Sequence, residues 1–287
     1  MKITSDWHIH SANSCDEAAL SVWDLLREAP AKGIRDLGLT DHIHTPFNLP
    51  DLANSRAEFD REGASGRFHF GVEVSCVSQW EIEQIARGAV ANPVYGIRTG
   101  GPAGCQLAIG LAEADLERFD VEFVVGGTHW PMYVPMQRET IIRDYHRQNM
   151  FLANHSLVDI VAHPWWWHGH WQDDSGHFSD EPWFDDFGCI PQSMHVEFAA
   201  AAIQNRKRVE INLGAMLLNP AYPQRFKQQY LEYLGGLNSS GVSLCIGSDC
   251  HDVHYDVDFE SAATMLDSVG IAEKDLWVLP PREAKDG

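Results

Sequence analysis

The sequence predicts an α/β protein in which strands and helices alternate to build a barrel. Short apolar runs rich in β-branched residues are separated by longer segments with helical character. Several of these runs stop at a residue that can bind a metal ion: residues 37–40 lead to Asp41 and His42, residues 70–72 to Glu73, and residues 160–162 to His163. Ligand-type residues at strand ends are typical of barrels whose working face lies at the carboxyl ends of the strands.

The composition limits the classes of partner. The 287 residues include 21 Lys and Arg against 41 Asp and Glu, and the formal net charge of −20 opposes binding to long nucleic acid. A small anion stays compatible with this charge, because bound cations can invert the local field. The sequence has no run of about 18 apolar residues, so we expect no membrane span.

The cysteines and the N-terminus bear on the compartment. The six cysteines show no paired spacing and several fall in strand-like runs, which favours reduced thiols. The N-terminus lacks a basic segment followed by an apolar one, so we expect no signal peptide and a cytoplasmic protein. We expect one domain over residues 1–287, with loop insertions at about 89–110 and 164–192, and leave open whether it forms oligomers.

The first strand begins near Ile3 and ends in the pair His8 and His10. Alternate residues of a strand point to the same face, so both imidazoles enter one space, and imidazole is the commonest side-chain ligand of transition metals. A helical stretch is expected from Asp16 to about Ala29. Asp16 is either the N-cap of this helix or a further metal ligand, and the residues alone leave both open.

The second and third strands each end at further ligand-type residues. Residues 34–40 lead to Asp41 and His42, while His44 is more typical of a residue behind the ligands or at the surface. The third strand, residues 68–74, carries Glu73 and lies between helices expected at 51–66 and 80–88. A carboxylate among histidines suits a bridge between two metal ions.

Residues 91–110 are rich in Gly and Pro and predict a loop longer than the usual connection. Arg98 lies in this loop and either contacts a substrate or is a solvated charge. Further along, the strand at 123–127 ends at His129 and the strand at 160–162 ends at His163. One helix is expected at about 111–118, before the strand at 123–127, and another at about 137–154, between the two strands.

The segment 165–171 carries four tryptophans and two histidines. An exposed apolar cluster of this kind marks either a cover over the working face or a subunit contact, and both stay open. The irregular spacing of His168, His170 and His177 favours surface residues over a second metal site. Later elements are a helix at 193–205, a strand at 208–212, a helix at 223–235, a strand ending at Asp249 and His251, and a helix at 258–268.

Taken together, the ligand-type motifs resemble those of the PHP (polymerase and histidinol phosphatase) family. The order His-x-His, Thr-Asp-His, Gly-x-Glu, His, Ala-His-Pro, Glu-x-Asn, Ser-Asp-x-His is found here at His8 and His10, Asp41 and His42, Glu73, His129, His163, Glu210 and Asn212, and Asp249 and His251. The amidohydrolase superfamily shares part of this pattern. It normally lacks the Thr-Asp-His after the second strand and the paired Asp-x-His, so the PHP resemblance is favoured.

The resemblance implies a distorted (β/α)7 barrel that holds two or three divalent ions of zinc, manganese or iron. Carried over residue by residue, the first metal site would comprise His8, His10, Glu73 and Asp249. Glu73, as a bridge, would hold the second metal with His129 and His163. His42 and His251 would hold the third, completed by Asp16, which stands where the family often has a His or Asp.

The implied activity is hydrolysis of a small phosphate monoester or diester, directed to histidinol phosphate or to a nucleotide. A hydroxide held by the first two metals would attack phosphorus, and Asp249, His251 and His42 are candidate donors of a proton to the leaving group if one metal site is empty. A metal-dependent hydrolase of a C–N or C–O bond and a non-catalytic metal-binding module stay open as alternatives.

The family's phosphatases add arginines that grip the phosphate, and no motif places one here. Arg98, Arg138 and Arg143 are candidates by position alone. The tryptophan segment is not typical of histidinol phosphatases and indicates a bulkier or more apolar substrate. Trp165 and Trp166 are expected to line the pocket and could stack an aromatic ring of a nucleotide or aryl ester.

Overall fold

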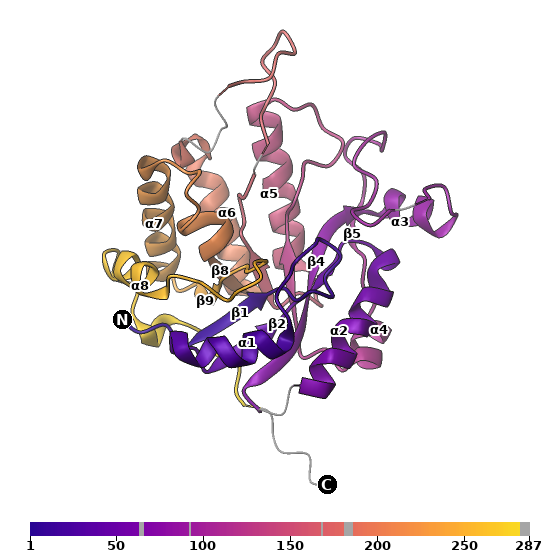
Figure 1. Ribbon diagram of the computed structural model, residues 1–287. Coiled ribbons are helices and arrows are strands. Elements are labelled where there is room, and N and C mark those ends of the chain that lie inside the picture. The colour runs from indigo at the N-terminus through magenta and orange to yellow at the C-terminus, as the bar shows by residue number, and fades with distance from the viewer. Residues whose placement is uncertain (63–65, 92, 168, 181–185, 282–287) are drawn as a thin grey trace.

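The parallel strands form a sheet that curls into a nearly closed barrel, as predicted (Figure 1). The computed structural model describes residues 1–62, 66–91, 93–167, 169–180 and 186–281. The strands lie in the order β1 (Ser5–Ile9), β2 (Asp36–Leu39), β4 (Phe68–Ser78), β6 (Phe123–Gly127), β7 (Ile160–Ala162), β8 (Arg208–Asn212) and β9 (Ser243–Gly247). The short strands β3 (His42–Ile43) and β5 (Leu107–Ile109) pair with the second half of β4.

Backbone hydrogen bonds join β1 to the segment that follows β9 and so bring the two ends of the sheet together. The Asp249 amide donates to the His8 carbonyl at 2.8 Å, and the His10 amide donates to the Cys250 carbonyl at 3.1 Å. Residues at opposite ends of the chain therefore share one rim of the barrel.

Helices surround the sheet (Figure 1). They are α1 (Val22–Glu28), α2 (Leu49–Glu62), α3 (Gln79–Ala86), α4 (Glu113–Phe119), α5 (Arg138–Asn154), α6 (Gln192–Gln204), α7 (Gln224–Ser239) and α8 (Phe259–Asp267). A π-helical turn, Leu213–Leu217, follows β8, and 3₁₀ turns lie at Ala29–Lys32, Pro46–Asn48, Phe187–Cys189 and Glu273–Asp275. None of the helices described is long and apolar enough to cross a membrane.

The first helix begins later than the sequence suggested. Ser21 is its N-cap, with the side-chain hydroxyl accepting a hydrogen bond from the Asp24 amide at 3.0 Å. The expected helix start at Asp16 is therefore wrong, because Ser21 satisfies the free amide of the first turn in the way an N-cap does. Residues 11–21 form a loop, and Asp16 lies in it at the mouth of the barrel.

Aromatic rings fill the amino-terminal end of the barrel. Trp7 packs edge-on against Phe123 with ring centroids 5.8 Å apart, and its centroid lies 5.3 Å from that of Trp277. A Cβ atom at Gly38 or Gly71 would lie 2.5 Å from the Phe123 ring, so these positions leave the space that this ring occupies. With this end filled, the site described below lies at the carboxyl ends of the strands.

Residues 169–180 extend beyond the end of α5 (Figure 1). A single antiparallel bridge pairs Gln172 with Phe178. His170 and His177 in this segment are exposed, as their irregular spacing indicated, whereas His168 lies outside the described residues.

Candidate metal centre

Glu73 lies at the centre of the site on β4 and is fully buried. Its Oε1 atom is 3.2 Å from His129 Nε2 and 3.1 Å from His163 Nε2. Its Oε2 atom is 3.2 Å from His8 Nε2 and 2.8 Å from His42 Nδ1. The two oxygens therefore face two different groups of imidazoles, which is the arrangement that a bridging carboxylate requires.

His8 and His10 form the second part of the site with Asp249. The two Nε2 atoms are 2.9 Å apart, and Asp249 Oδ1 lies 3.5 Å from His8 Nε2 and 3.3 Å from His10 Nε2. The backbone φ of Asp249 is +56° and that of His163 is +26°, conformations that non-glycine residues rarely adopt. Such strain persists where the surroundings determine it, and it is concentrated at functional sites.

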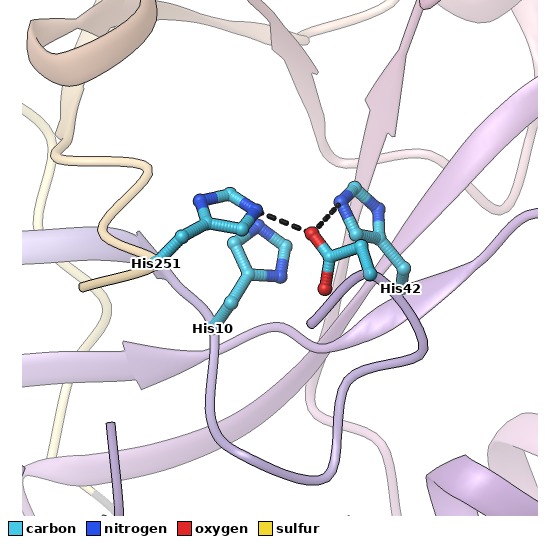
Figure 2. A group of neighbouring side chains, drawn as sticks. His10, His42 and His251 are labelled. Atoms are coloured by element: carbon cyan, nitrogen blue, oxygen red, sulfur yellow. Dashed lines mark ion pairs between the residues drawn. The ribbon is translucent and has the colours of Figure 1, made fainter. Parts of the chain in front are cut away.

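The third part of the site is formed by Asp16, His42 and His251. Asp16 Oδ2 lies 3.1 Å from His42 Nε2 and 2.5 Å from His251 Nε2. Figure 2 draws the ion pairs of His42 and His251 as dashed lines. His10 lies beside the other two imidazoles in the same view, with its ring centroid 4.2 Å from that of His251. The loop position of Asp16 thus brings it to the ligand-type residues, and the alternative of a helix cap is excluded.

Charges in the site suit metal ligands. Burial alone would raise the pKa of Glu73, but the imidazoles of His42 and His8 outweigh it and hold this pKa well below its ordinary value. Burial, together with neighbouring imidazoles, lowers the pKa of His10 to about 3, and burial lowers the pKa of His129 to about 4. Burial alone would lower the pKa of His8 and of His42, but the carboxylates of Glu210 beside His8 and of Glu73 beside His42 outweigh it and raise both pKa values, that of His42 to about 10. Metal ions bind ionised carboxylates and neutral imidazoles, so a cation would displace the protons of these two histidines.

Glu210 on β8 contacts the ligand-type residues at atoms other than those that would bind a metal ion. Its Oε1 atom is 2.6 Å from His8 Nδ1, and its Oε2 atom accepts hydrogen bonds from the His163 amide at 2.7 Å and from Asn212 Nδ2 at 3.0 Å. Asn212 Nδ2 also donates to Asp249 Oδ2 at 3.1 Å. A carboxylate on the far nitrogen of a histidine fixes its tautomer and turns the other nitrogen toward the metal. The sequence motif contained Glu210 and Asn212 but gave them no role.

Ser75 joins two histidines of the site. Its hydroxyl lies 2.9 Å from His129 Nδ1 and 2.6 Å from His44 Nδ1. If His129 binds a cation through Nε2, its proton is on Nδ1 and donates to Ser75, whose own proton then donates to His44. The proton of His44 is then on Nε2, and His44 is one of the residues that line the cavity described below. The repeated i+2 spacing after His42 was the one sequence signal for His44.

Asp41, the middle residue of the Thr-Asp-His motif, has a structural role. It is buried and accepts hydrogen bonds from the Ser11 amide at 2.5 Å and from the Ser11 hydroxyl at 2.6 Å. These bonds secure the start of the loop that carries Asp16.

A cavity of about 400 Å³ opens over the site, within the size range of small-molecule pockets. Its lining combines ligand-type residues with an aromatic and cationic wall: Asp16, His42, His44, Tyr95, Arg98, His129, Trp130, His163, Trp166, Gly214, Ala215, Asp249 and His251. Arg98 and Trp166 thus lie where a substrate contact was expected.

The structure does not bring Trp165 and Arg143 to this cavity, and these two expectations are corrected. Trp165 is fully buried and packs edge-on against His195 of α6, with ring centroids 5.7 Å apart. Its φ of +102° turns the chain so that neighbouring indoles point in different directions, and Trp166 faces the cavity while Trp165 enters the core. Arg143 is exposed on α5, because that face of the helix points away from the barrel.

Comparison with solved structures places this architecture among known barrels. A histidinol phosphate phosphatase from Lactococcus lactis subsp. lactis Il1403, solved with zinc, L-histidinol and phosphate, is 17% identical with a TM-score of 0.57, covering 94% of each chain. A putative histidinol phosphatase from Listeria monocytogenes is 10% identical with a TM-score of 0.51, covering 87% of this chain and 96% of its own. The chain shares its fold with these proteins.

No protein-family model matches the chain, and no curated protein sequence matches it. A zinc-containing amidohydrolase from Burkholderia multivorans is also similar, at 12% identity and a TM-score of 0.45, with 96% of each chain covered. At 17% and 10% identity the two histidinol phosphatase structures establish the fold alone, and the chemistry must be argued from the side chains.

Proposed function

We propose that this protein is a metal-dependent phosphoesterase that hydrolyses small phosphate esters. The observation that carries the proposal is the convergence on one cavity of four overlapping groups of ligand-type side chains, which share His8, His10, His42 and Glu73. Within each group the potential ligand atoms lie within 4.8 Å of one another. The similar fold of a protein solved with zinc, L-histidinol and phosphate supports the reaction class.

Several buried atoms of the site fit a cation better than any partner in the chain. Among the described residues, Asp16 Oδ1 and His10 Nδ1 are buried and have no hydrogen-bond partner, while Glu73 Oε2 and His42 Nδ1 are buried and contact each other at 2.8 Å without the geometry of a hydrogen bond. Buried polar atoms without partners are rare and costly, so a cluster of them calls for an explanation. Imidazole and carboxylate donors suit zinc, iron and manganese alike.

We assign the potential ligands to three sites. His8, His10, Glu73 and Asp249 would hold the first ion, and Glu73, His129 and His163 the second. Asp16, His42 and His251 would hold the third, with His10 close enough to contribute. Bound divalent ions would lower the pKa of water and neutralise phosphoryl oxygens.

The chain's own residues would position the ester and move protons. In the reaction, a water molecule gives up a proton to solvent and its oxygen forms a bond to phosphorus. The bond from phosphorus to the ester oxygen breaks, and the ester oxygen takes up a proton. If one metal site is empty, Asp249, His251 and His42 are the candidate donors of this proton, because all three line the cavity. The aromatic wall of Trp130 and Trp166 would exclude water from the side of the leaving group.

Phosphate release from a panel of esters tests the proposal. The protein would be loaded with zinc, manganese or iron and assayed with histidinol phosphate, nucleotides and aryl phosphates. We expect Glu73→Ala to lose bound metal and activity together, by at least about 100-fold in activity. His177→Ala changes an exposed histidine outside the cavity and should match the wild type.

Two results would contradict the proposal. A Glu73→Ala protein that stays active and fully metal-loaded would end the assignment of Glu73 as the bridge. A metal-replete wild type that releases no phosphate from any ester would favour a C–N or C–O hydrolase, to be tested with amides and lactones. Metal binding without turnover on either panel would favour a non-catalytic module.

A further inference from the structure

Arg98 lies on the wall of the cavity and is held there by aromatic groups. Its Cζ atom is 3.4 Å from the centroid of the Trp130 ring and 5.5 Å from that of Tyr95. Its Nε donates to the Tyr95 carbonyl at 3.1 Å. Cation–π contacts of this kind fix the plane of a guanidinium without neutralising its charge.

The terminal nitrogens of Arg98 remain available to a ligand. Within the described ranges, neither of them makes a hydrogen bond or ion pair. The Trp130 ring covers one face of the guanidinium, whereas its N–H donors lie in its plane and form a fork that matches a carboxylate or phosphate. Among the described residues that line the cavity, Arg98 carries the one permanent positive charge.

Arg98 is not paired with the carboxylates of the proposed metal sites. No ion pair joins it to Glu73, Asp16 or Asp249, and the carboxylate whose charge acts on it most is Glu81. Trp130, whose ring lies under the Arg98 guanidinium, is in turn a neighbour of His129, with ring centroids 5.6 Å apart. Arg98 therefore occupies a second layer around the proposed metal ligands.

The rest of this wall is aromatic. Tyr95, Trp130 and Trp166 line the cavity together with His44, whose Nε2 is buried and has no hydrogen-bond partner among the described residues. Flat rings of this kind accommodate the flat ring of a ligand. The wall thus offers flat surfaces that suit a planar group, together with one positive charge.

We propose that this wall is a leaving-group subsite, in which Arg98 binds an anionic substituent on a planar leaving group. The inference rests on the proposed phosphoesterase function and names its substrate class: phosphate esters of planar, usually aromatic alcohols that carry a carboxylate or a second phosphate. Arg98 in this scheme selects the leaving group and does not hold the phosphoryl group that is transferred.

A matched pair of substrates tests this assignment. The first is 4-carboxyphenyl phosphate, and the second is 4-carbamoylphenyl phosphate, which has the same shape without the charge. The carbamoyl group withdraws electrons more strongly, so intrinsic reactivity favours the neutral ester. We expect the wild type to prefer the anionic ester by about tenfold in kcat/KM, equal to about 1.4 kcal/mol.

Variants of Arg98 should remove this preference. In Arg98→Gln we expect the ratio to fall below about twofold, mainly through a higher KM for the anionic ester, and Arg98→Lys should retain part of it. Arg143→Gln is the control, since Arg143 is exposed on α5 and does not line the cavity. If Arg98→Gln lowers kcat/KM equally for both esters, Arg98 acts on the transferred phosphoryl group and the inference is overturned. A wild type that does not prefer the anionic ester would also overturn it.

A binding measurement separates failure of the subsite from failure of the proposed function. Calorimetry would compare 4-hydroxybenzoate with 4-hydroxybenzamide on zinc-loaded wild type and on Arg98→Gln. A roughly tenfold preference for the acid that disappears in Arg98→Gln supports the subsite even if neither ester is hydrolysed. Equal affinities for the two compounds in the wild type would refute it.

Discussion

Replacing Glu210 by Gln tests whether the residues behind the site set its metal affinity. Glu210 only accepts hydrogen bonds, and its partners are His8 Nδ1, the His163 amide and Asn212 Nδ2. If the Gln oxygen keeps the last two donors, its amide nitrogen faces His8 Nδ1. His8 must then accept there and carry its proton on Nε2, the atom that lies 3.2 Å from Glu73 and 3.5 Å from Asp249. That proton blocks metal binding.

The other orientation of the amide has its own cost. The side-chain oxygen would then accept from His8, while the His163 amide and Asn212 would face a donor, and each unsatisfied buried donor costs about 1–3 kcal/mol. Loss of a partner behind a metal ligand commonly lowers metal affinity by about 10–100-fold. We therefore expect Glu210→Gln either to bind zinc at least about tenfold more weakly or to lose about 2–4 kcal/mol of unfolding free energy.

Zinc affinity from competition with a chelator, and urea unfolding of the metal-free protein, would measure the two effects. Glu197→Gln is a matched control, because Glu197 also pairs with a histidine, His146, at 2.7 Å, but its side chain is 68% exposed. Exposed pairs contribute little, so this variant should behave as the wild type within about 0.5 kcal/mol. A Glu210→Gln protein with wild-type affinity and wild-type stability would refute the role of Glu210.

The remaining predictions concern stability, pH and positioning. Trp165→Ala should cost about 3–5 kcal/mol of unfolding free energy in urea titrations, because the side chain is fully buried, while Trp166→Ala should mainly raise KM. Equal destabilisation by the two substitutions would contradict the placement of Trp165 in the core and of Trp166 at the cavity. Burial, with nearby His146, lowers the pKa of His195 from 6.5 to about 4. The unfolded state therefore binds the proton first as pH falls, and stability should decrease between about pH 6.5 and 4, by at most about 3 kcal/mol from this group. In His195→Gln, the unfolding free energy should vary less with pH over this range. An unchanged pH profile would contradict the assignment of this stability loss to His195. Ser75→Ala should weaken zinc binding and shift the ¹⁵N resonances of His44 in the loaded protein, and unchanged resonances would exclude the proton arrangement drawn through Ser75.

Much of the site could be predicted because it depends on local periodicity. The alternation of a strand places His8 and His10 on one face, and a run that ends at Glu73 or His163 must present that residue at the strand's carboxyl end. The parallel order of the strands then brings these ends to one rim. The barrel and the meeting of the potential ligands follow from these two rules.

Other features depend on contacts between distant parts of the chain. Glu210 reaches His8 across 202 positions of sequence, and Ser75 reaches His129 across 54, so no local pattern indicates either contact. The helix start at Ser21 instead of Asp16 was a choice between two acceptable caps, which the packing of the loop decided. Neither these distant contacts nor the choice of helix cap affects the periodicity of the sequence, so periodicity predicts neither.

The sequence by itself therefore determined which residues end the strands and what chemistry those residues can perform. The tertiary structure alone decided that Trp166 faces the cavity while Trp165 fills the core, and that Arg98 stacks on Trp130 while Arg143 stays outside. The physical reason is that a hydrophobic or charged side chain fits several environments equally well. Barrel closure and the local turn of the backbone choose among them.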